Sequence, residues 1–352
     1  MAERSTDKPS WSEVAPYRAL ALQLTARAVN RLGAAEAREA IRSSIARVAA
    51  QVKASCNFIG PDCRLVVLPE YFLTGFPMGE GVAEWQAKAC LQPDGPEYEA
   101  IARIAADNRL FLCGNAYECD PHFPELFFQA CFVFDPSGSL ILRYHRLNSL
   151  YTATPHDVLD RYLDMYGRDA LFPVARTELG NLACIASEEI LYPEIARCLA
   201  LRGAEVFLHP TSEIGSLIPS QKNIAKLARA TENLAYVVSA NSAGITDCDI
   251  PAQSTDGHSQ VVNYAGSRMC EAGFGESMAA SAPIHIQALR QYRARPGMPN
   301  LLSRQRNELF AAEYARPVYP ANSLSEAAPG RAQFLRTQQS AIDTLRDRGV
   351  IP

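Results

Sequence analysis

The spacing of apolar and polar positions predicts strands and helices that alternate along most of the chain. Short apolar runs of strand length recur at 18–24, 64–68, 110–117, 128–134, 140–144, 182–186, 205–208 and 235–240. Between these runs lie amphipathic segments at 34–54, 96–107, 193–201 and 220–233. In the first of them, apolar side chains recur at the spacing of one helix face: Ile41, Ile45, Val48 and Val52. Strands that alternate with helices predict a layered α/β domain.

The pattern changes towards the C-terminus. Three further strands are predicted at 259–264, 268–271 and 279–286, after which the chain becomes polar. Helical segments then follow at 287–295, 301–314 and 331–346, with a linker rich in proline, alanine and serine at 317–330. Because this tail has little apolar surface of its own, we expect an arm rather than a second domain. We therefore predict a flexible N-terminus at 1–16, one domain at 17–290 and a C-terminal extension at 291–352 that serves oligomerisation.

The composition argues against several classes of protein. A chain of 352 residues that is 48% hydrophobic can bury a sizeable core. A net charge of −4 without a block of like charge argues against binding to nucleic acid or to a membrane surface. No apolar run reaches the ~20 residues that a membrane span needs, and without an apolar leader we expect no signal peptide. Because the chain shows no leader, we expect its ten cysteines to be free thiols in the cytoplasm. They lack Cys-x-x-Cys and zinc-type spacings, so we expect no metal, and we expect no cofactor.

Lysine is scarce among the basic residues. Of the 34 lysines and arginines only five are lysines: Lys8, Lys53, Lys88, Lys222 and Lys226. We interpret this preference for arginine as a bias of genome composition. It matters wherever an arginine occupies a position at which a lysine is expected, because such a change then needs no functional cause.

Two segments place charged side chains at the ends of strands. The apolar strand at 65–68 runs into Pro69-Glu70, so a carboxylate lies at the end of a buried strand. The turn at 135–138 predicts a hairpin, and the strand after it ends in Tyr144-His145-Arg146. Both segments also have a purely structural interpretation. A strand followed by Pro-Glu occurs by chance in many proteins, and His145 and Arg146 could be solvated residues after an edge strand.

A third segment is the most specific. The strand at 182–186 is followed by Ser187-Glu188-Glu189 and then by Tyr192-Pro193-Glu194, where a helix begins. The next strand ends in His209-Pro210, and Ala228-Arg229-Ala230-Thr231-Glu232-Asn233 lies in the following helix. These residues resemble, almost position for position, the nucleophile elbow, helix and next strand of the nitrilase superfamily of carbon–nitrogen hydrolases.

The resemblance covers residues 17–290. It implies an α/β fold, the four-layer α-β-β-α sandwich of the carbon–nitrogen hydrolase type. It implies Glu70 as the general base, Arg146 in place of the lysine that stabilises the oxyanion, and Ser187 in place of the nucleophilic cysteine. We expect these three side chains to converge in one pocket. It also implies a homodimer or larger homo-oligomer, paired through the helix after the elbow and the polar tail.

The substitutions alter the expected chemistry. In the family a carboxylate takes the thiol proton, the thiolate attacks a nitrile or amide carbon, a lysine holds the oxyanion, and water releases the acyl group. A serine hydroxyl is a far weaker acid than a thiol of pKa ~8.5, so Glu70 would deprotonate Ser187 only in concert with attack. Arg146 can still donate to an oxyanion, but its larger fork needs a reshaped pocket. Esters, lactones and activated amides are therefore expected as substrates rather than nitriles.

Three interpretations of Ser187 stay open. It is a working nucleophile in a retuned site, it orients a ligand for different chemistry, or it remains in a binding protein that has lost catalysis. The survival of Glu70 and the polar character of both replacements favour a maintained site. The sequence thus predicts a cofactor-free hydrolase of a small amide or ester. The alternatives are a catalytically inactive binding or regulatory protein and, third, ligase- or lyase-type acyl chemistry.

Residues next to these three are expected to form the rest of the pocket. Tyr71, Glu188 and Tyr192 are candidates for substrate binding, although core packing would also explain the aromatic ones. A backbone N–H after the elbow is expected to contribute to the oxyanion pocket.

Four further side chains are interpreted as structural. Cys184 lies three residues before Ser187, and because side chains alternate along a strand we expect it to face the core. Asp157 is interpreted as a turn or helix cap rather than as an assisting acid. His156 and His209 are interpreted as structural, and nothing in their spacing suggests a metal site.

Overall fold

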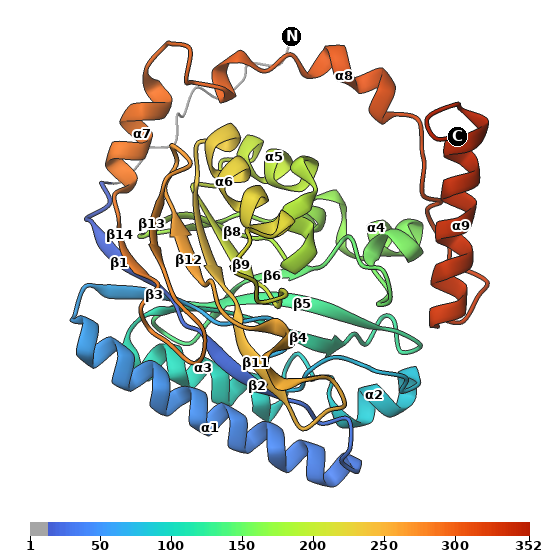
Figure 1. Ribbon diagram of the computed structural model, residues 1–352, viewed down its shortest axis with the longest axis horizontal. Coiled ribbons are helices and arrows are strands. Elements are labelled where there is room, and N and C mark those ends of the chain that lie inside the picture. Colours follow the sequence, from blue (N-terminus) through green and yellow to red (C-terminus); the bar gives the residue numbers. More distant parts are fainter. Residues whose placement is uncertain (1–12) are drawn as a thin grey trace.

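The computed structural model describes residues 13–352, so most of the N-terminal segment predicted to be flexible, residues 1–12, lies outside the described residues. Two six-stranded sheets lie face to face, and helices cover the outer face of each (Figure 1). The protein is thus a four-layer α-β-β-α sandwich, which confirms the fold class predicted from the sequence.

The two sheets have similar plans. The first runs in the order β14 (Ser281–Ile284), β1 (Tyr17–Ala21), β3 (Cys63–Val67), β4 (Phe111–Cys119), β5 (Phe127–Phe134) and β6 (Leu140–His145). The second runs in the order β13 (Arg268–Glu271), β12 (Gln260–Val262), β10 (Tyr236–Ala240), β9 (Val206–Pro210), β8 (Gly180–Cys184) and β7 (Ala175–Thr177). The central pairs β1–β3, β3–β4, β8–β9 and β9–β10 are parallel, so the carboxyl ends of β3 and β8–β10 can supply a site.

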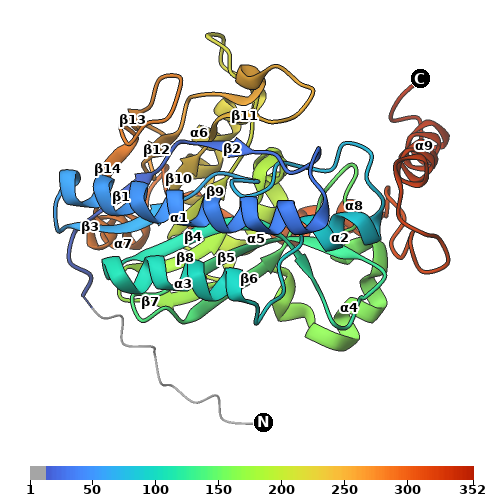
Figure 2. The same cartoon turned by 90° about the horizontal axis from the view of Figure 1, so that it is seen from below.

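The helices enclose these sheets. Figures 1 and 2 show α1 (Ala34–Ile59) and α3 (Pro96–Asn108) along the outer face of the first sheet, with α2 (Val82–Lys88) at one end. Two helices, α5 (Pro193–Leu201) and α6 (Gln221–Asn233), cover the second sheet. The predicted apolar face of α1 is buried: Ile41, Ile45, Val48 and Val52 all belong to the core beneath it.

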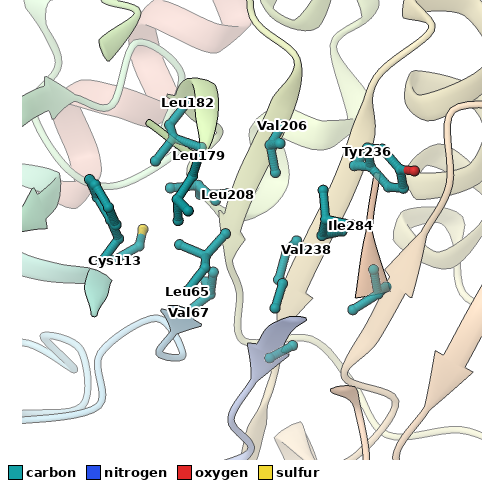
Figure 3. Packing of buried hydrophobic residues seen from close by; sticks show 14 of the residues in the cluster. Leu65, Val67, Cys113, Leu179, Leu182, Val206, Leu208, Tyr236, Val238 and Ile284 are labelled. Atoms are coloured by element: carbon teal, nitrogen blue, oxygen red, sulfur yellow. The ribbon is translucent and has the colours of Figure 1, made fainter. Parts of the chain in front are cut away.

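One of the two large hydrophobic cores lies between the sheets. Leu65 and Val67 of β3 meet Leu182 of β8, Leu208 of β9 and Val238 of β10 there, and all five are fully buried (Figure 3). Because side chains alternate along a strand, the residues between them face the outer helices instead. This packing fixes the ends of β3 and β8 relative to each other and so positions the residues that follow both strands.

Several element boundaries differ from the prediction. The strand expected at 18–24 is divided into β1 and β2 (Leu24–Arg27), because Gln23 is buried and its amide donates to the carbonyls of Gly273 and Gly275. The strand expected at 182–186 ends at Cys184, which leaves two residues to make the turn before Ser187. The helix expected at 301–314 is a short 3-10 turn, Leu302–Arg304, followed by α8 (Asn307–Tyr314).

Some short elements were not predicted at all. These are α2, α4 (Leu159–Tyr166), β7 and β11 (Ser242–Thr246), which pairs with β2 in a separate two-stranded sheet. Each is too short for a hydrophobic period to show in the sequence.

The C-terminal extension lies along the outside of the sandwich. After helix α7 (Ile286–Ala294) the chain passes above α5 and α6 in the view of Figure 1, continues through α8 and ends in α9 (Arg331–Asp347). Phe334 of α9 packs with Phe123 and Tyr162 of the domain, so the extension is anchored on its own chain. Its role in oligomerisation stays a prediction. Within residues 13–352, no helix combines the length and the apolar character needed to cross a membrane.

Candidate functional site

The turn after β8 presents Ser187 at the end of the second sheet. Ser187 has a φ of 46°, a left-handed conformation that is uncommon for a residue with a side chain. It opens the 3-10 turn Ser187–Leu191, which leads into α5. The side chain is 3% exposed. A strained, buried turn that holds a hydroxyl at a strand end is the geometry of a nucleophile elbow.

His209 holds this turn from behind. Its Nε2 lies 2.8 Å from the carbonyl oxygen of Ser187 and its Nδ1 lies 2.8 Å from the Oγ of Ser239. Because a carbonyl only accepts, Nε2 carries the proton and Nδ1 accepts from the serine hydroxyl. Burial, with the charge of Lys226 adding to it, lowers the pKa of His209 to about 3. His209 is therefore neutral at physiological pH and has the structural role that was predicted for it.

Glu70 lies at the end of the first sheet, three residues after the last residue of β3. It is 1% exposed, and its backbone N–H donates to the carbonyl of Thr211 in the segment after β9, at 3.3 Å. Its Oε1 accepts from Gln129 Nε2 at 2.8 Å and from Arg146 Nη1 at 3.1 Å. A buried carboxylate is thus paired with a cation and an amide, as burial of its charge requires.

Arg146 follows β6 and is tied to several acceptors. Besides Glu70, it donates to Gln129 Oε1 at 2.5 Å, to the Asn148 carbonyl at 2.6 Å and to the Glu188 carboxylate. A guanidinium has five N–H groups, and these contacts use four of them. Burial acts to lower the pKa of Arg146, but the carboxylates of Glu188 and Glu70 outweigh it and raise the pKa overall.

Glu189 joins the elbow to the segment that carries Arg146. It is fully buried, and its carboxylate accepts from the backbone N–H groups of Leu147 at 2.6 Å and Asn148 at 3.1 Å. The same carboxylate accepts from the backbone of Ala186 at 2.9 Å and from the hydroxyl of Tyr144. Burial raises its pKa to about 7, although Arg146 and these donors oppose the shift. We interpret Glu189 as a positioning residue that fixes two loops to each other.

Lys222 is the residue that the sequence did not point to. It lies in the first turn of α6, and its Nζ is 2.9 Å from the Oγ of Ser187. The same nitrogen lies 3.3 Å from the Oγ1 of Thr211 and 3.3 Å from the carbonyl oxygen of Ser212. Burial lowers the pKa of Lys222, and the charges of Glu70 and Glu213 oppose the shift.

The three residues predicted to converge are brought together unequally. Glu70 and Arg146 are in direct contact, and Arg146 also reaches Glu188, the neighbour of Ser187. Within the described residues, no hydrogen bond joins the Ser187 side chain to Glu70 or Arg146, and its contact is with Lys222. The catalytic roles assigned to all three stay predictions.

The predicted substrate-binding residues border this site in different ways. Tyr71, next to Glu70, has a φ of 55° and stacks on Tyr117 with ring centroids 5.6 Å apart. Glu188 is bound to Arg146, and Tyr192 is exposed after the 3-10 turn. Burial raises the pKa of both Tyr71 and Tyr192, and a neighbouring carboxylate adds to each shift.

Cys184 and Asp157 lie away from the site. Cys184 is buried in the core between the sheets, with its Sγ 3.8 Å from that of Cys113, so it faces the core as expected. Asp157 accepts from the backbone and the hydroxyl of Thr154 at 2.9 and 2.8 Å, which is a capping arrangement. Among residues 13–352, no group of three or more His, Cys, Asp or Glu side chains is placed to hold a metal ion.

Comparison with known proteins agrees with the fold. The chain matches the carbon-nitrogen hydrolase family over residues 34–294. It is 30% identical over 261 residues to a protein named hydrolase in pqqF 5′ region of Pseudomonas protegens, covering 71% of this chain and 80% of that protein. It is 26% identical over 243 residues to a formamidase of Bacillus cereus, covering 68% of this chain and 67% of the formamidase.

A solved structure has the same architecture. A mutant of the amidase from Nesterenkonia sp. AN1, with the acetamide moiety of fluoroacetamide added covalently at its active site cysteine, matches with a TM-score of 0.57. The identity is 21%, and the match covers 84% of this chain and 96% of the amidase. With the family match over most of its length, the chain belongs to the carbon-nitrogen hydrolases, the nitrilase superfamily.

Proposed function

We propose that the protein is a hydrolase of a small amide or ester that works by acyl transfer to Ser187. In this proposal Ser187 occupies the position of the family's nucleophilic cysteine, Arg146 that of its lysine and Glu70 that of its general base. The observation that carries the proposal is the elbow: a buried hydroxyl in a left-handed turn at the end of β8, with its carbonyl held by His209.

The surroundings of Ser187 support this chemistry. An acyl transfer needs hydrogen-bond donors where negative charge develops on the substrate oxygen. Among the described residues, the guanidinium of Arg146 makes four hydrogen bonds, which leaves one of its five N–H groups for a substrate oxygen, and the backbone N–H of Glu188 is next to Ser187 in the chain. A hydroxyl is a poorer nucleophile than a thiolate, so the proposal favours esters, lactones and activated amides as substrates.

Mass spectrometry of the intact protein tests this proposal. After incubation with a panel of activated esters and amides, we expect the mass of the wild-type protein to increase by one acyl group. Peptide mapping should place this group on Ser187, and Ser187→Ala should show no increase. An adduct that persists in Ser187→Ala would contradict the proposal, because another residue would then be the nucleophile.

A binding or regulatory protein without catalysis is the alternative. It is favoured by the absence, within the described residues, of a hydrogen bond between Ser187 and either Glu70 or Arg146. If it holds, the wild-type protein and Ser187→Ala should both fail to turn over any member of the panel. The double variant Ser187→Cys/Arg146→Lys, which restores the family's usual residues, should then gain weak activity.

We also propose that the chain forms a homodimer or larger assembly through α5 and the C-terminal extension. Helix α8 presents Leu309 and Phe310, 68% and 51% exposed, and Leu201 at the end of α5 is 52% exposed. These exposed apolar side chains on α8 and α5 would be available for contact with a second copy of the chain. Light scattering at micromolar concentration should give at least twice the monomer mass, and Leu309→Asp/Phe310→Asp should lower it. A monomeric wild-type protein would contradict the proposal.

A further inference from the structure

We infer that Lys222 is the general base for Ser187, so that the nucleophile is activated by a serine–lysine pair rather than by Glu70. The inference rests on the proposed function, because it assigns a role to Lys222 in the same acyl transfer. Lysine is a known partner of a serine nucleophile in unrelated hydrolases.

The contacts of Lys222 suit a base that gains and loses one proton. Its Nζ has three neighbours among the described residues: Ser187 Oγ at 2.9 Å, Thr211 Oγ1 at 3.3 Å and the Ser212 carbonyl at 3.3 Å. A neutral amine has two N–H groups and one lone pair. It can donate to Thr211 and Ser212 while it accepts the hydroxyl proton of Ser187, and the ammonium form can donate to all three. Both protonation states are therefore satisfied without any movement.

Lys226, one helical turn further along α6, provides a contrast. Its ammonium group is fully buried and forms a salt bridge with Glu213, which a charged lysine in such a place requires. Within the described residues, Lys222 forms no salt bridge. The Glu213 carboxylate, which could have paired with it, is bound by Lys226 and by the hydroxyl of Ser220. Among residues 13–352, Lys222 thus has no direct counter-ion that would hold it in the charged form.

The charged and titratable groups that act on Lys222 come from the ends of both sheets and from α6 itself. Two carboxylates favour its ammonium form and two cations oppose it, while a neutral imidazole lies behind Ser187: Glu70, Glu213, Arg146, Lys226 and His209. Because the two pairs of charges oppose each other, burial decides the direction, and the pKa of Lys222 is lowered. A lysine shifted in this direction is neutral for a larger fraction of the time near neutral pH.

Glu70 is less suited to take the proton of Ser187. Its Oε1 already accepts from Gln129 and Arg146, which hold the carboxylate in place. Within residues 13–352, no hydrogen bond joins the carboxylate to the Ser187 hydroxyl, whereas Lys222 is in direct contact with it. A general base must lie within hydrogen-bond reach of the proton that it removes, and Lys222 meets this condition.

The proton then follows a closed path. As Ser187 Oγ bonds to the carbonyl carbon, its proton passes to Lys222 Nζ and the carbonyl electrons move onto oxygen. When the tetrahedral intermediate collapses, the bond to the leaving group breaks and the Lys222 ammonium returns the proton to the leaving nitrogen or oxygen. Water next gives its proton to Lys222 and attacks the acyl carbon. The proton returns to Ser187 Oγ as the carboxylic acid product leaves.

A fluorophosphonate probe tests this role without knowledge of the substrate. Its phosphorus accepts Ser187 Oγ and releases fluoride, so the mass of the intact protein reports the rate. We expect Lys222→Met and Lys222→Arg both to lower the labelling rate constant at least about 100-fold, the usual contribution of a general base. Lys53→Met, on the exposed surface of α1, is the matched control and should label like the wild-type protein. The wild-type rate should rise with pH to a plateau that is reached below the ordinary lysine pKa of 10.5.

Further measurements separate this role from the alternatives. Added methylamine should partly restore the labelling of Lys222→Ala, and it should do so more strongly at high pH, where the amine is neutral. The melting temperature of each variant shows whether it is folded. Lys222→Arg at the wild-type rate would overturn the inference, because a cation would then suffice. Labelling that survives in Lys222→Met but is lost in Glu70→Gln would also overturn it, although Ser187 would remain the nucleophile. No labelling of folded wild-type protein would instead overturn the proposed function, and the inference with it.

Discussion

The two sides of the site differ in how their charges are held. On the side of the first sheet, Arg146 is bound by Glu70, Gln129 and Glu188, so each buried charge has a partner. On the side of the second sheet, Ser187 and Lys222 contact each other, and Lys222 has no salt bridge within the described residues. On the first side the charged groups are held by ion pairs with each other. On the second side a hydroxyl and an amine are in direct contact, and we propose that a proton passes between them.

Because of this difference, we expect substitutions on one side of the site to change mainly stability and substitutions on the other to change mainly activity. Removing one member of a buried ion pair leaves an unpaired charge, so substitutions on the first side should destabilise the fold. Substitution of Ser187 or Lys222 disrupts no ion pair among the described residues, so it should affect catalysis with little effect on folding. Glu70 and Arg146 lie in recognisable motifs, but in our proposal it is Lys222 that takes the proton of Ser187.

The largest effect is expected from Ser187→Ala. Removal of the nucleophile should lower kcat/KM by about 10⁴-fold or more for any ester or amide that the wild-type protein hydrolyses. The melting temperature should change little, because only one oxygen is lost. Ser187→Cys need not improve turnover, since the site around it holds a hydroxyl against Lys222. Full activity in Ser187→Ala would remove the serine mechanism altogether.

The next effect concerns stability on the ionic side. Glu70→Gln removes the fully buried partner of Arg146 and should lower the free energy of unfolding by about 3 kcal/mol. Glu188→Gln is the matched control, because Glu188 pairs with the same guanidinium but is 33% exposed. It should cost less than about 1 kcal/mol. Urea denaturation would measure both, and equal costs would show that the network does not depend on burial.

Glu189 is expected to make stability depend on pH. Burial raises its pKa from 4.5 to about 7, so between these values the folded chain keeps a proton that the unfolded chain has lost. Its contribution to the free energy of unfolding is therefore present below about pH 4.5 and is lost as the pH rises through 7. The slope is at most about 1.4 kcal/mol per pH unit.

Glu189→Gln should remove this slope, because an amide keeps the shape of the protonated carboxyl but cannot titrate. Urea denaturation of both proteins at pH 5, 6, 7 and 8 would measure the difference. Parallel curves for wild type and variant would show that Glu189 is charged across this range and that its four donors outweigh burial.

The fold and the places of Glu70 and Ser187 at strand ends could be predicted from the sequence because both depend on local patterns. Hydrophobic periods predicted the main helices and strands, and Glu70 and Ser187 each lie three residues after the end of a strand. The shorter elements were missed because three to eight residues carry too little of a period. The division of the first strand at Gln23 was missed because the partners of that side chain lie about 250 residues away.

Lys222 could not be predicted because its position depends on tertiary structure. The amphipathic pattern indicated helix α6. It did not indicate that the first turn of this helix lies beside the residues that follow β8 and β9. The scarcity of lysine was visible, and two of the five lysines lie four residues apart on this helix. Only the folded chain shows that Lys226 is paired with Glu213 while Lys222 reaches Ser187.

The smallest effect is expected from Cys184→Ala, on the opposite side of the turn from Ser187. Cys184 lies in the core between the sheets, 3.8 Å from Cys113, and burial raises its pKa well above the ordinary thiol value. A protonated thiol in such a place is a poor nucleophile and packs as a small apolar group. The substitution should cost about 1 kcal/mol of stability by leaving a small cavity. It should leave kcat/KM and fluorophosphonate labelling at the wild-type values, and a loss of either in folded Cys184→Ala would return this thiol to consideration as the nucleophile.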